Sequence, residues 1–435
     1  MLRSAAKNGI FPLFKPLLYS PVNIHYSDPI FFYLRSMIGK IKQLAAAYKN
    51  EFIQVRQHLH AHPELSYEEY ETSRYVQEKL SGWGIPFEVK ATTGVIGIIK
   101  GKNPDSRVVA LRADMDALPI LEENDISYKS TNTGVMHACG HDVHTTCLLG
   151  AAKILQELKD EWEGTVKLIF QPGEEKNPGG ASLLIKENVL ENPRPSAIFG
   201  LHVHPGLPIG KLSFRAGKAM ASADELYITV KGKGGHAAAP HLCVDPILIA
   251  SHLIIALQQV VSRNNDPHNP SVLSITAFNG GSTTNVIPNE VKLKGTFRAM
   301  DETWRFKAHG LIKQITENLV KSMGGEVDLL IDVGYPCVYN NEGLHEVAKR
   351  IAVDFMGDAL LVEETEKRMG AEDFGYYSQQ IPGCFYRLGV MNKEKGITAG
   401  VHTPTFNIDE NAIETGIGMM AMLGATAKYD VSIDS

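Results

Sequence analysis

Five residues that can bind a metal ion stand at the ends of predicted strands, spread over more than half of the 435-residue chain. In sequence order they are Cys139, His141, Glu175, His202 and His402. Each follows or ends an apolar run, and an α/β sheet places its ligands at the carboxyl ends of its strands. A chain that gathers these residues must return distant strand ends to one edge of a sheet. Strands that alternate with helical segments predict such a sheet, mainly parallel, in an α/β protein.

The types of ligand predict the kind of metal site. A thiolate, imidazoles and a carboxylate suit zinc-like borderline ions, and Mn or Co can occupy the same site when available. One open tetrahedral ion uses three protein ligands plus water, so five ligands are too many for it. Two ions need eight bonds; five residues supply six of them if Cys139 bridges, and a bridging water supplies two. A bidentate Glu175 relaxes this count. The sequence therefore favours two divalent metal ions per subunit.

Further carboxylates flank the predicted ligands. Glu174 stands beside Glu175 after a turn-forming Pro-Gly pair. We expect Glu174 to be a general base that takes a proton from water and passes it to a leaving amine; the alternative is a side chain that points to solvent. Asp114 and Asp116 end a buried strand, and either can orient a ligand histidine or cap the following turn. Asp142, next to a ligand, has the same two interpretations.

A glycine-rich stretch, Gly232-Lys-Gly-Gly-His-Ala-Ala-Ala-Pro240, holds His236 among small residues. A histidine in such a loop can approach a substrate closely and stabilise a tetrahedral oxyanion. Asn285 lies in a second glycine-rich loop and can add an amide donor. The alternative is that both loops are ordinary turns.

The helical and strand patterns divide the chain into two domains. Residues 38–217 and 333–435 are expected to form the metal-binding catalytic domain, with a capping box at Ser66–Glu69 opening one helix. Residues 218–332 follow the order β-α-β-β-α-β of a ferredoxin-like unit and are expected to form an inserted satellite domain. Closure of this insert about hinges near 218 and 333 is expected to carry His236 to the substrate.

Residues 1–37 are expected to be an extension outside the folded enzyme. It carries four basic residues against one acid, and four prolines break up its apolar pieces. One interpretation is an organelle transit peptide or a weak secretion signal, and the other is a plain extension or a start placed too early, with Met37 as the working start.

Composition limits the location and the partners. A net charge of −6 argues against nucleic-acid binding. No run of 18 apolar residues exists, so no membrane span is expected. Five widely spaced cysteines indicate a reducing compartment, and we expect a cytoplasmic protein.

Several motifs resemble those of the M20 metallopeptidase family, in its amidohydrolase branch of hippurate hydrolases, N-acyl-amino-acid hydrolases and plant auxin-conjugate hydrolases. They are Ala113-Asp-Met-Asp-Ala-Leu-Pro119, Cys139-Gly-His-Asp142, Gln171-Pro-Gly-Glu-Glu175, Lys231-Gly-Lys-Gly-Gly-His236, Asn285-Val-Ile-Pro288 and Val401-His-Thr403. The resemblance covers about residues 38–430. It implies the five ligands of a dimetal site, Glu174 as acid/base, and His236 as a satellite residue that meets the substrate. In dimeric relatives that histidine can come from the partner subunit.

The expected activity is metal-dependent hydrolysis of the amide bond in a small N-acyl amino acid, by a homodimer joined through the satellite domain. A metallo-dipeptidase or carboxypeptidase of similar mechanism is the nearest alternative. A metal-dependent binding protein without turnover is the non-enzyme alternative, and the intact Glu174 argues against it. A thiol hydrolase built on Cys139 and His141 would keep its activity in a chelator.

Overall fold

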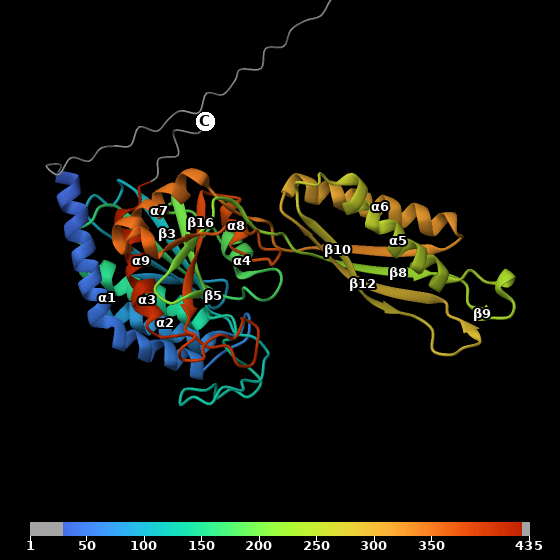
Figure 1. Cartoon of the computed structure of the whole chain (residues 1–435), viewed down its shortest axis with the longest axis horizontal. Helices are drawn as coiled ribbons and strands as arrows, with labels where there is room; N and C mark the ends of the chain where they lie inside the picture. The colour runs from blue at the N-terminus through green and yellow to red at the C-terminus, as the bar shows by residue number, and fades with distance from the viewer. Residues whose placement is uncertain (1–28, 429–435) are drawn as a thin grey trace, which may run out of the picture.

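The computed structural model describes residues 29–428, and its two parts are joined by two adjacent chain segments (Figure 1). The larger part contains both the N-terminal and C-terminal elements, and the smaller part extends away from it. The two parts have separate hydrophobic cores. Residues 1–28, which hold most of the predicted extension, lie outside the described residues.

The larger part is built on an eight-stranded sheet of order β1-β2-β4-β3-β5-β16-β6-β15. Its strands are β1 (Phe87–Lys90), β2 (Gly94–Lys100), β3 (Val108–Asp114), β4 (Thr165–Gln171), β5 (Ala197–Pro208), β6 (Leu212–Phe214), β15 (Leu361–Glu363) and β16 (Gly383–Met391). The central strands β4, β3, β5 and β16 are mutually parallel, and antiparallel pairs lie toward the edges. This is the mainly parallel α/β sheet that the sequence predicts.

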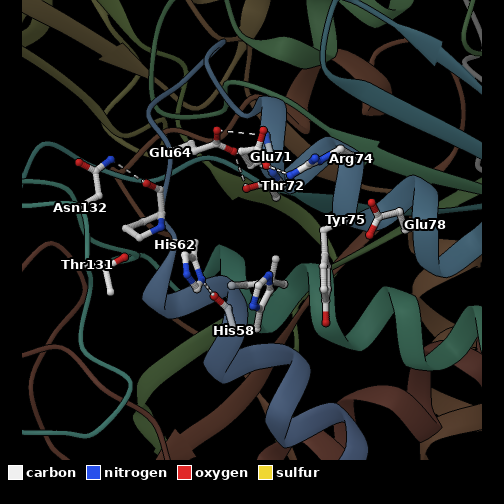
Figure 2. A pocket seen from close by; sticks show the side chains of 12 residues that line it. His58, His62, Glu64, Glu71, Thr72, Arg74, Tyr75, Glu78, Thr131 and Asn132 are labelled. Atoms are coloured by element: carbon white, nitrogen blue, oxygen red, sulfur yellow. Dashed lines mark hydrogen bonds and ion pairs between the residues drawn. The ribbon is translucent and has the colours of Figure 1, made fainter.

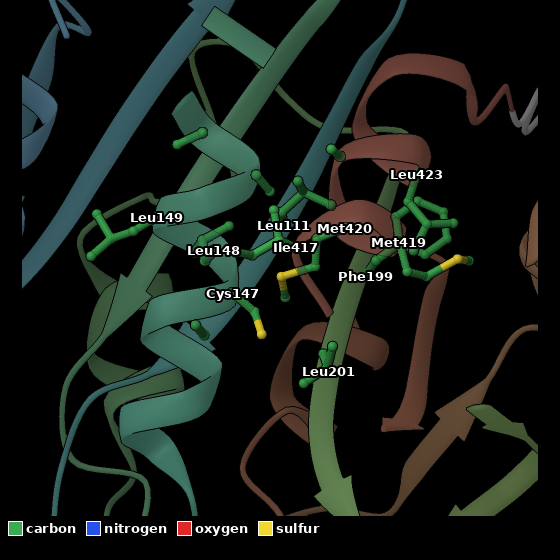
Figure 3. Packing of buried hydrophobic residues seen from close by; sticks show 14 of the residues in the cluster. Leu111, Cys147, Leu148, Leu149, Phe199, Leu201, Ile417, Met419, Met420 and Leu423 are labelled. Carbon is green, nitrogen blue, oxygen red and sulfur yellow. The ribbon is translucent and has the colours of Figure 1, made fainter. Parts of the chain in front are cut away.

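Helices cover both faces of this sheet. They are α1 (Pro29–Ala61), α2 (Tyr70–Gly82), α3 (His141–Glu157), α4 (Gly180–Lys186), α7 (Glu342–Met356), α8 (Gly375–Ser378) and α9 (Ala412–Thr426), with a short 3₁₀ turn at Asp358–Leu360. Leu111 of β3 packs with α3 and α9 on one face (Figure 3), whereas its neighbour Ala110 belongs to the cluster on the opposite face. Alternate residues of a strand point to opposite faces, which explains why these strands are apolar throughout.

The smaller part is a four-stranded antiparallel sheet of order β10-β12-β8-β13. Its elements are β8 (Asp224–Lys231), β9 (Gly235–His236), a 3₁₀ turn (Pro240–Leu242), α5 (Pro246–Asn264), β10 (Ser271–Asn279), β11 (Val286–Ile287), β12 (Glu290–Ala299), α6 (Glu302–Ser322) and β13 (Glu326–Val333). Two helices pack on one sheet face, and Asp245 caps α5 by accepting from the N–H groups of Ile247 and Leu248. The chain order and the strand order are those of a ferredoxin-like unit.

The junction lies slightly inside the interval 218–332. A short pair, β7 (Gly217–Met220) with β14 (Val338–Asn340), belongs to the larger part. The chain therefore leaves the larger part after Met220 and returns through Val333 at the end of β13.

Two local predictions are wrong. The first helix begins at Pro29 and not near Ile38, and Met37 is buried in the main core, because the apolar spacing continues upstream of the expected start. Ser66–Glu69 is no capping box, since the Glu69 side chain makes no cap hydrogen bond at the start of α2. The Ser66 hydroxyl donates instead to Asp116.

Among the described residues, only α5 has the length and hydropathy of a candidate membrane span. This finding rests on length and composition, and one such helix is weak evidence. In α5, Ile249, Leu253, Leu257 and Val260 are buried against the satellite sheet, as in the core helix of a globular domain.

Candidate metal centre

The five predicted ligands converge at the carboxyl-terminal edge of the central strands. Cys139 lies just before α3 and His141 is its first residue, Glu175 follows β4, and His202 lies on β5. His402 lies in the loop after β16 with φ of 61°, a left-handed conformation that is uncommon for a residue other than glycine. Four separate connections of the sheet therefore supply one site.

Gly140 makes the close spacing of Cys139 and His141 possible. Its φ is 86°, and a Cβ atom there would lie 2.5 Å from Cγ2 of Val203. A side chain at this position would be strained and would collide with β5. The Cys-Gly-His motif thus places a thiol and an imidazole on one short turn against the sheet.

The ligand atoms form two groups that share Cys139. One group contains Cys139, His141 and His202, the other contains Cys139, Glu175 and His402, and the atoms of each group lie within 4.8 Å of one another. The Cys139 Sγ atom lies 3.5 Å from Nε2 of His202. Oε1 of Glu175 lies 3.2 Å from Nε2 of His402 and 3.9 Å from Nε2 of His141. This is the arrangement expected of a thiolate between two cations.

Unpaired buried atoms fit metal binding at this place. Nε2 of His141 is buried without a hydrogen-bond partner, and buried Oε1 of Glu175 has only its contact with His402, an arrangement that is costly unless a cation occupies the site. The Nδ1 atoms of the two buried ligand histidines have protein partners. Nδ1 of His141 lies 3.1 Å from Oδ1 of Asp116, and Nδ1–H of His202 donates to the carbonyl of Val203 at 2.8 Å. Such contacts orient a ligand histidine toward the metal.

The electrostatics of the site also favour a cation. Hydrogen bonds with Cys139 and Glu175 raise the pKa of His402 to about 10. Burial, followed by the charge of Glu175, raises the pKa of the Cys139 thiol. Burial, followed by His144 and Arg387, holds the pKa of His202 well below its ordinary value, so this imidazole is neutral as a ligand must be. Metal binding here is coupled to release of the thiol proton.

Glu174 is buried beside this cluster and does not point to solvent. Its exposed fraction is 6%, and its carboxylate groups with His141 and Glu175. Burial, then the charges of Glu372, Glu175 and Asp373, raise its pKa well above the ordinary value. A buried carboxyl group that favours the proton is suited to general acid–base chemistry.

The turn before Glu174 is fixed from a distant element. Gly173 has φ of 52°, and its N–H donates to Oε1 of Glu69 at 2.7 Å. The hydroxyl of Tyr335 donates to the Glu174 carbonyl at 2.6 Å. Glu69 and Tyr335 thus position the candidate base, although sequence reasoning did not select either residue.

The three predicted aspartates have different surroundings. Asp116 contacts His141 and also accepts from the Glu175 N–H at 2.9 Å, which links two predicted ligands. Asp114 accepts from Nδ1 of His144 at 2.6 Å and lies 3.9 Å from Nε2 of His141. Asp142 pairs with Arg56 and His60 in a separate buried network.

His236 and Asn285 lie together but far from the metal ligands. Both are exposed at the outer end of the satellite domain, where β9 pairs with β11 and the Ala237 N–H donates to the Asn285 carbonyl (Figure 1). They lie beyond the far end of β8, whose eight residues span about 25 Å. The near end of β8 borders the cleft that contains Glu175.

Closure within one chain therefore cannot bring His236 to the substrate, and that expectation is wrong. Rotation about a hinge leaves the distance from the hinge to the tip unchanged. Tyr335 follows the return hinge directly and bonds Glu174, so the hinge lies beside the site. The tip therefore stays about 25 Å from the hinge, and far from the metal ligands beside the hinge, at any hinge angle.

Sequence reasoning also missed a buried charge network behind the ligands. Arg112 of β3 pairs with three carboxylates, those of Asp114, Glu372 and Asp373, at 2.6–3.0 Å. The available signal was Arg112 itself, since a charge inside an apolar strand requires buried partners.

Two cavities meet at the metal ligands. One, of about 630 Å³, lies within the larger part and includes Cys139, Glu174, His202 and His402 in its wall. The other, of about 1200 Å³, lies between the larger part and the satellite sheet and includes Glu175 and His402. A substrate that spans the ligands can place one half in each cavity.

A third cavity of about 560 Å³ lies apart from the candidate site, near the end of α1 and the start of α2 (Figure 2). His58 and His62 line it, with ring centroids 4.6 Å apart. None of the five predicted ligands borders it.

Comparison with known proteins identifies the family. The model for peptidase family M20/M25/M40 matches residues 110–425. The chain is 43% identical over 384 residues to IAA-amino acid hydrolase ILR1-like 5 of Arabidopsis thaliana, with 87% of each chain covered. It is 39% identical to thermostable carboxypeptidase 2 of Saccharolobus solfataricus, covering 89% of this chain and 98% of that one. The chain belongs to the M20 peptidase family. It is a metal-dependent hydrolase of the amidohydrolase and peptidase type.

The M20 fold is also seen in a solved relative. A Bacillus subtilis protein described as a dinuclear metal binding peptidase of the M20 family superposes with a TM-score of 0.75 at 34% identity, covering 87% of this chain and 98% of that one. The resemblance expected from the sequence motifs is thus confirmed at the level of family and fold.

Proposed function

We propose that this M20 protein hydrolyses the amide bond of small N-acyl amino acids at a centre of two divalent metal ions. The observation that carries this proposal is the sharing of Cys139 between two ligand groups, with Glu174 buried beside both. Cys139, His141 and His202 would hold one ion, and Cys139, Glu175 and His402 the other. When bound, the ions polarise the scissile carbonyl and acidify the nucleophilic water.

The residues of the chain then supply the proton transfers. Glu174 takes a proton from the nucleophilic water and passes it to the departing nitrogen, so the same carboxylate serves as base and then as acid. The network of Arg112, Glu372 and Asp373 surrounds Glu174 with buried charge and fixes its environment. The products are a carboxylic acid and a free amino acid.

The cleft toward the satellite domain fits the amino-acid half of the substrate. Lys294 and Arg298 of β12 line it. Cations of this kind bind an α-carboxylate through charge-assisted hydrogen bonds. The same feature serves the carboxypeptidase alternative, which the name of the archaeal relative favours. A hydrolysis screen of N-acetyl, N-benzoyl and longer N-acyl amino acids beside dipeptides, with metal content measured, separates the two. Faster turnover of dipeptides would contradict the proposal.

We also propose a homodimer in which the partner's His236 completes the site. A tip histidine that cannot reach its own metal centre can reach that of a second copy. The satellite surface has apolar side chains without partners in the described chain: Leu248 and Ile255 of α5 are 51% and 72% exposed. Large exposed apolar groups on one helix mark a surface that another copy can cover. There the partner's His236 would stabilise the oxyanion, and Asn285 would add an amide donor.

The cysteines support the proposed location. All five are free in the structure, which fits a reducing compartment such as the cytoplasm.

A further inference from the structure

Arg387 lies beside the metal ligands in a position that the hydrolytic mechanism leaves unexplained. It is on β16 and pairs in register with His202 of the neighbouring parallel strand β5. Residues paired in this way point to the same face of a sheet. The Arg387 side chain therefore lines the same 630 Å³ cavity as His202, Cys139 and Glu174.

The guanidinium of Arg387 is buried without a carboxylate partner. Its exposed fraction is 7%. Its hydrogen bond goes to the thioether sulfur of Met220 at 2.9 Å, and it lies 5.0 Å from the ring centroid of Phe385. Among residues 29–428, no carboxylate lies within ion-pair distance of it. A thioether is a weak acceptor, so most of the five N–H donors of this side chain remain available.

The other deeply buried arginines show what a paired site looks like in this fold. Arg56 pairs with Asp142 and Glu410, Arg112 with Asp114, Glu372 and Asp373, and Arg305 with Asp224 and Glu302. Burial of an uncompensated charge is costly. Arg387 departs from this pattern, and it does so where a substrate must enter.

The surroundings of Arg387 cannot supply the missing anion. Burial, and next the neighbouring Arg368, lower its pKa to about 10, so it is still charged at neutral pH. Arg368 lines the same cavity and is already paired with Glu364. Burial and these two arginines lower the pKa of His204 to about 4, so that ring is neutral. The wall of the cavity contains Glu174, Glu175 and Glu372 as well as the two arginines, but none of these carboxylates is in an ion pair with Arg387, so a ligand can supply its anion.

We propose that Arg387 is a specificity-determining residue that binds a carboxylate at the far end of the acyl group, so that the enzyme prefers N-acyl amino acids whose acyl chain is a dicarboxylic half-amide, such as succinyl or glutaryl. This inference rests on the proposed function. The assignment to the acyl half follows from the two cavities: Lys294 and Arg298 on the satellite side fit the α-carboxylate. The cavity of Arg387 is left for the other half of the molecule.

The test compares two substrates that differ only at the end of the acyl chain. N-succinyl and N-butanoyl derivatives of one amino acid have four-carbon acyl groups that end in a carboxylate and a methyl group. The wild-type enzyme is expected to show a higher kcat/KM for the succinyl compound. Arg387→Met, which keeps the length of the side chain, should lower kcat/KM for that compound about 10- to 100-fold, the usual worth of hydrogen bonds to a charged group. The value for the butanoyl compound should change little.

Two control variants separate this role from stability and from general charge. Arg387→Lys keeps the charge without the planar fork and should restore part of the preference. Arg350→Met, on the exposed side of α7 away from both cavities, should leave both kcat/KM values unchanged. Metal content and thermal melting are measured on the same preparations. An equal loss on both acyl compounds in Arg387→Met would overturn the proposal.

A binding arm without turnover separates this inference from the proposed function. In the Glu174→Gln background, the succinyl compound should bind more tightly than the butanoyl compound, and adding Arg387→Met should abolish the difference. If the wild type cleaves N-acyl amino acids with no succinyl preference in either arm, only the inference about Arg387 fails. If no N-acyl amino acid is cleaved, the proposed function fails and the binding arm still decides the role of Arg387. Loss of activity that disappears when the α-carboxylate is blocked as an amide would assign Arg387 to the amino-acid half, against the proposal.

Discussion

At the scale of single residues, substitution of Glu174 tests the proposed catalytic step separately from metal binding. Its carboxylate lies among the predicted ligands, but Glu175 provides the oxygen nearest to His402. Glu174→Gln is expected to keep the metal content of the wild type and to lose about 10²- to 10⁴-fold in turnover, the usual contribution of general acid–base catalysis. Steady-state kinetics with metal analysis on one preparation measures both quantities. Wild-type turnover in the variant would refute the role of Glu174.

Cys139 is expected to behave as a ligand and not as a nucleophile. A chelator should abolish activity, and added Mn or Zn should restore it. Alkylation of the thiol should be slow in the metal-loaded protein and faster in the metal-free protein, because coordination occupies the sulfur. The readout is labelled Cys139 by mass spectrometry, with the half-buried Cys243 of the satellite domain as the internal control. Full activity after complete metal removal would favour a thiol hydrolase instead.

Most residues of the candidate metal centre could be predicted because metal-binding residue types stand in short sequence motifs. Cys139, His141, Glu175, His202 and His402 are metal-binding types at strand ends, and the structure gathers all five. No sequence motif singles out Arg387. In the described part of the chain it is distinguished by having no carboxylate within ion-pair distance, and this depends on how distant chain segments pack around it.

At the scale of elements, the junction between the two parts depends on Asp224 at the start of β8. It accepts hydrogen bonds from Arg305 of α6 and His309, and Arg305 also donates to the Gly334 carbonyl at 2.9 Å. These contacts join the outgoing strand, a satellite helix and the returning segment. They hold one end of the satellite sheet in place beside the interdomain cleft.

Asp224→Asn is expected to destabilise the satellite domain by about 3–5 kcal/mol, because it leaves the buried Arg305 without its main partner. Burial opposes ionisation of Asp224, but hydrogen bonds from His309 and Arg305 hold its pKa below the ordinary value. This stabilising contribution is present above the unfolded-state pKa and is lost as the pH falls through the folded-state pKa. Chemical denaturation measures the change. Asp328→Asn, which removes an exposed ion pair with Lys231, is the control and should cost much less.

Element order was predictable, whereas element ends and neighbours were not. Alternation and helical spacing predict the βαββαβ order of the insert. The start of α1 at Pro29 lies upstream of the expected start near Ile38, and the unused capping box at Ser66–Glu69 reflects a tertiary contact, the hydrogen bond from Ser66 to Asp116. Propensity is a weak guide where a side chain has a better partner elsewhere in the fold.

At the scale of the whole molecule, the separation between the metal ligands and the satellite tip is the observation that supports the proposed second copy. The sequence shows that β8 is followed by the His236 loop, but not that the strand points away from the catalytic sheet (Figure 1). The direction of β8 follows from the junction at Asp224 and Tyr335, which involves segments more than 100 residues apart in sequence.

The proposed dimer should depend on the exposed apolar face of α5. Leu248→Lys combined with Ile255→Lys is expected to give a monomer that keeps its metal and loses most activity, since burial of charge at an apolar interface is costly. Light scattering gives the mass, and metal analysis shows whether the centre is intact. Leu360→Lys, a similar change at an exposed leucine of the larger part, is the control and should leave the dimer unaffected. A fully active monomer would contradict the proposed dimer.

The most direct test of an active site shared between two subunits is complementation between two inactive variants. Glu174→Gln lacks the base and His236→Ala lacks the tip histidine, so each homodimer should have little activity. If the histidine acts across the dimer, a mixed dimer contains one site with an intact base and an intact partner histidine. Random exchange of equal amounts should then recover about a quarter of wild-type activity, because half of the dimers are mixed and one of their two sites works. No recovery after verified subunit exchange would show that each His236 serves its own chain, and would contradict the account.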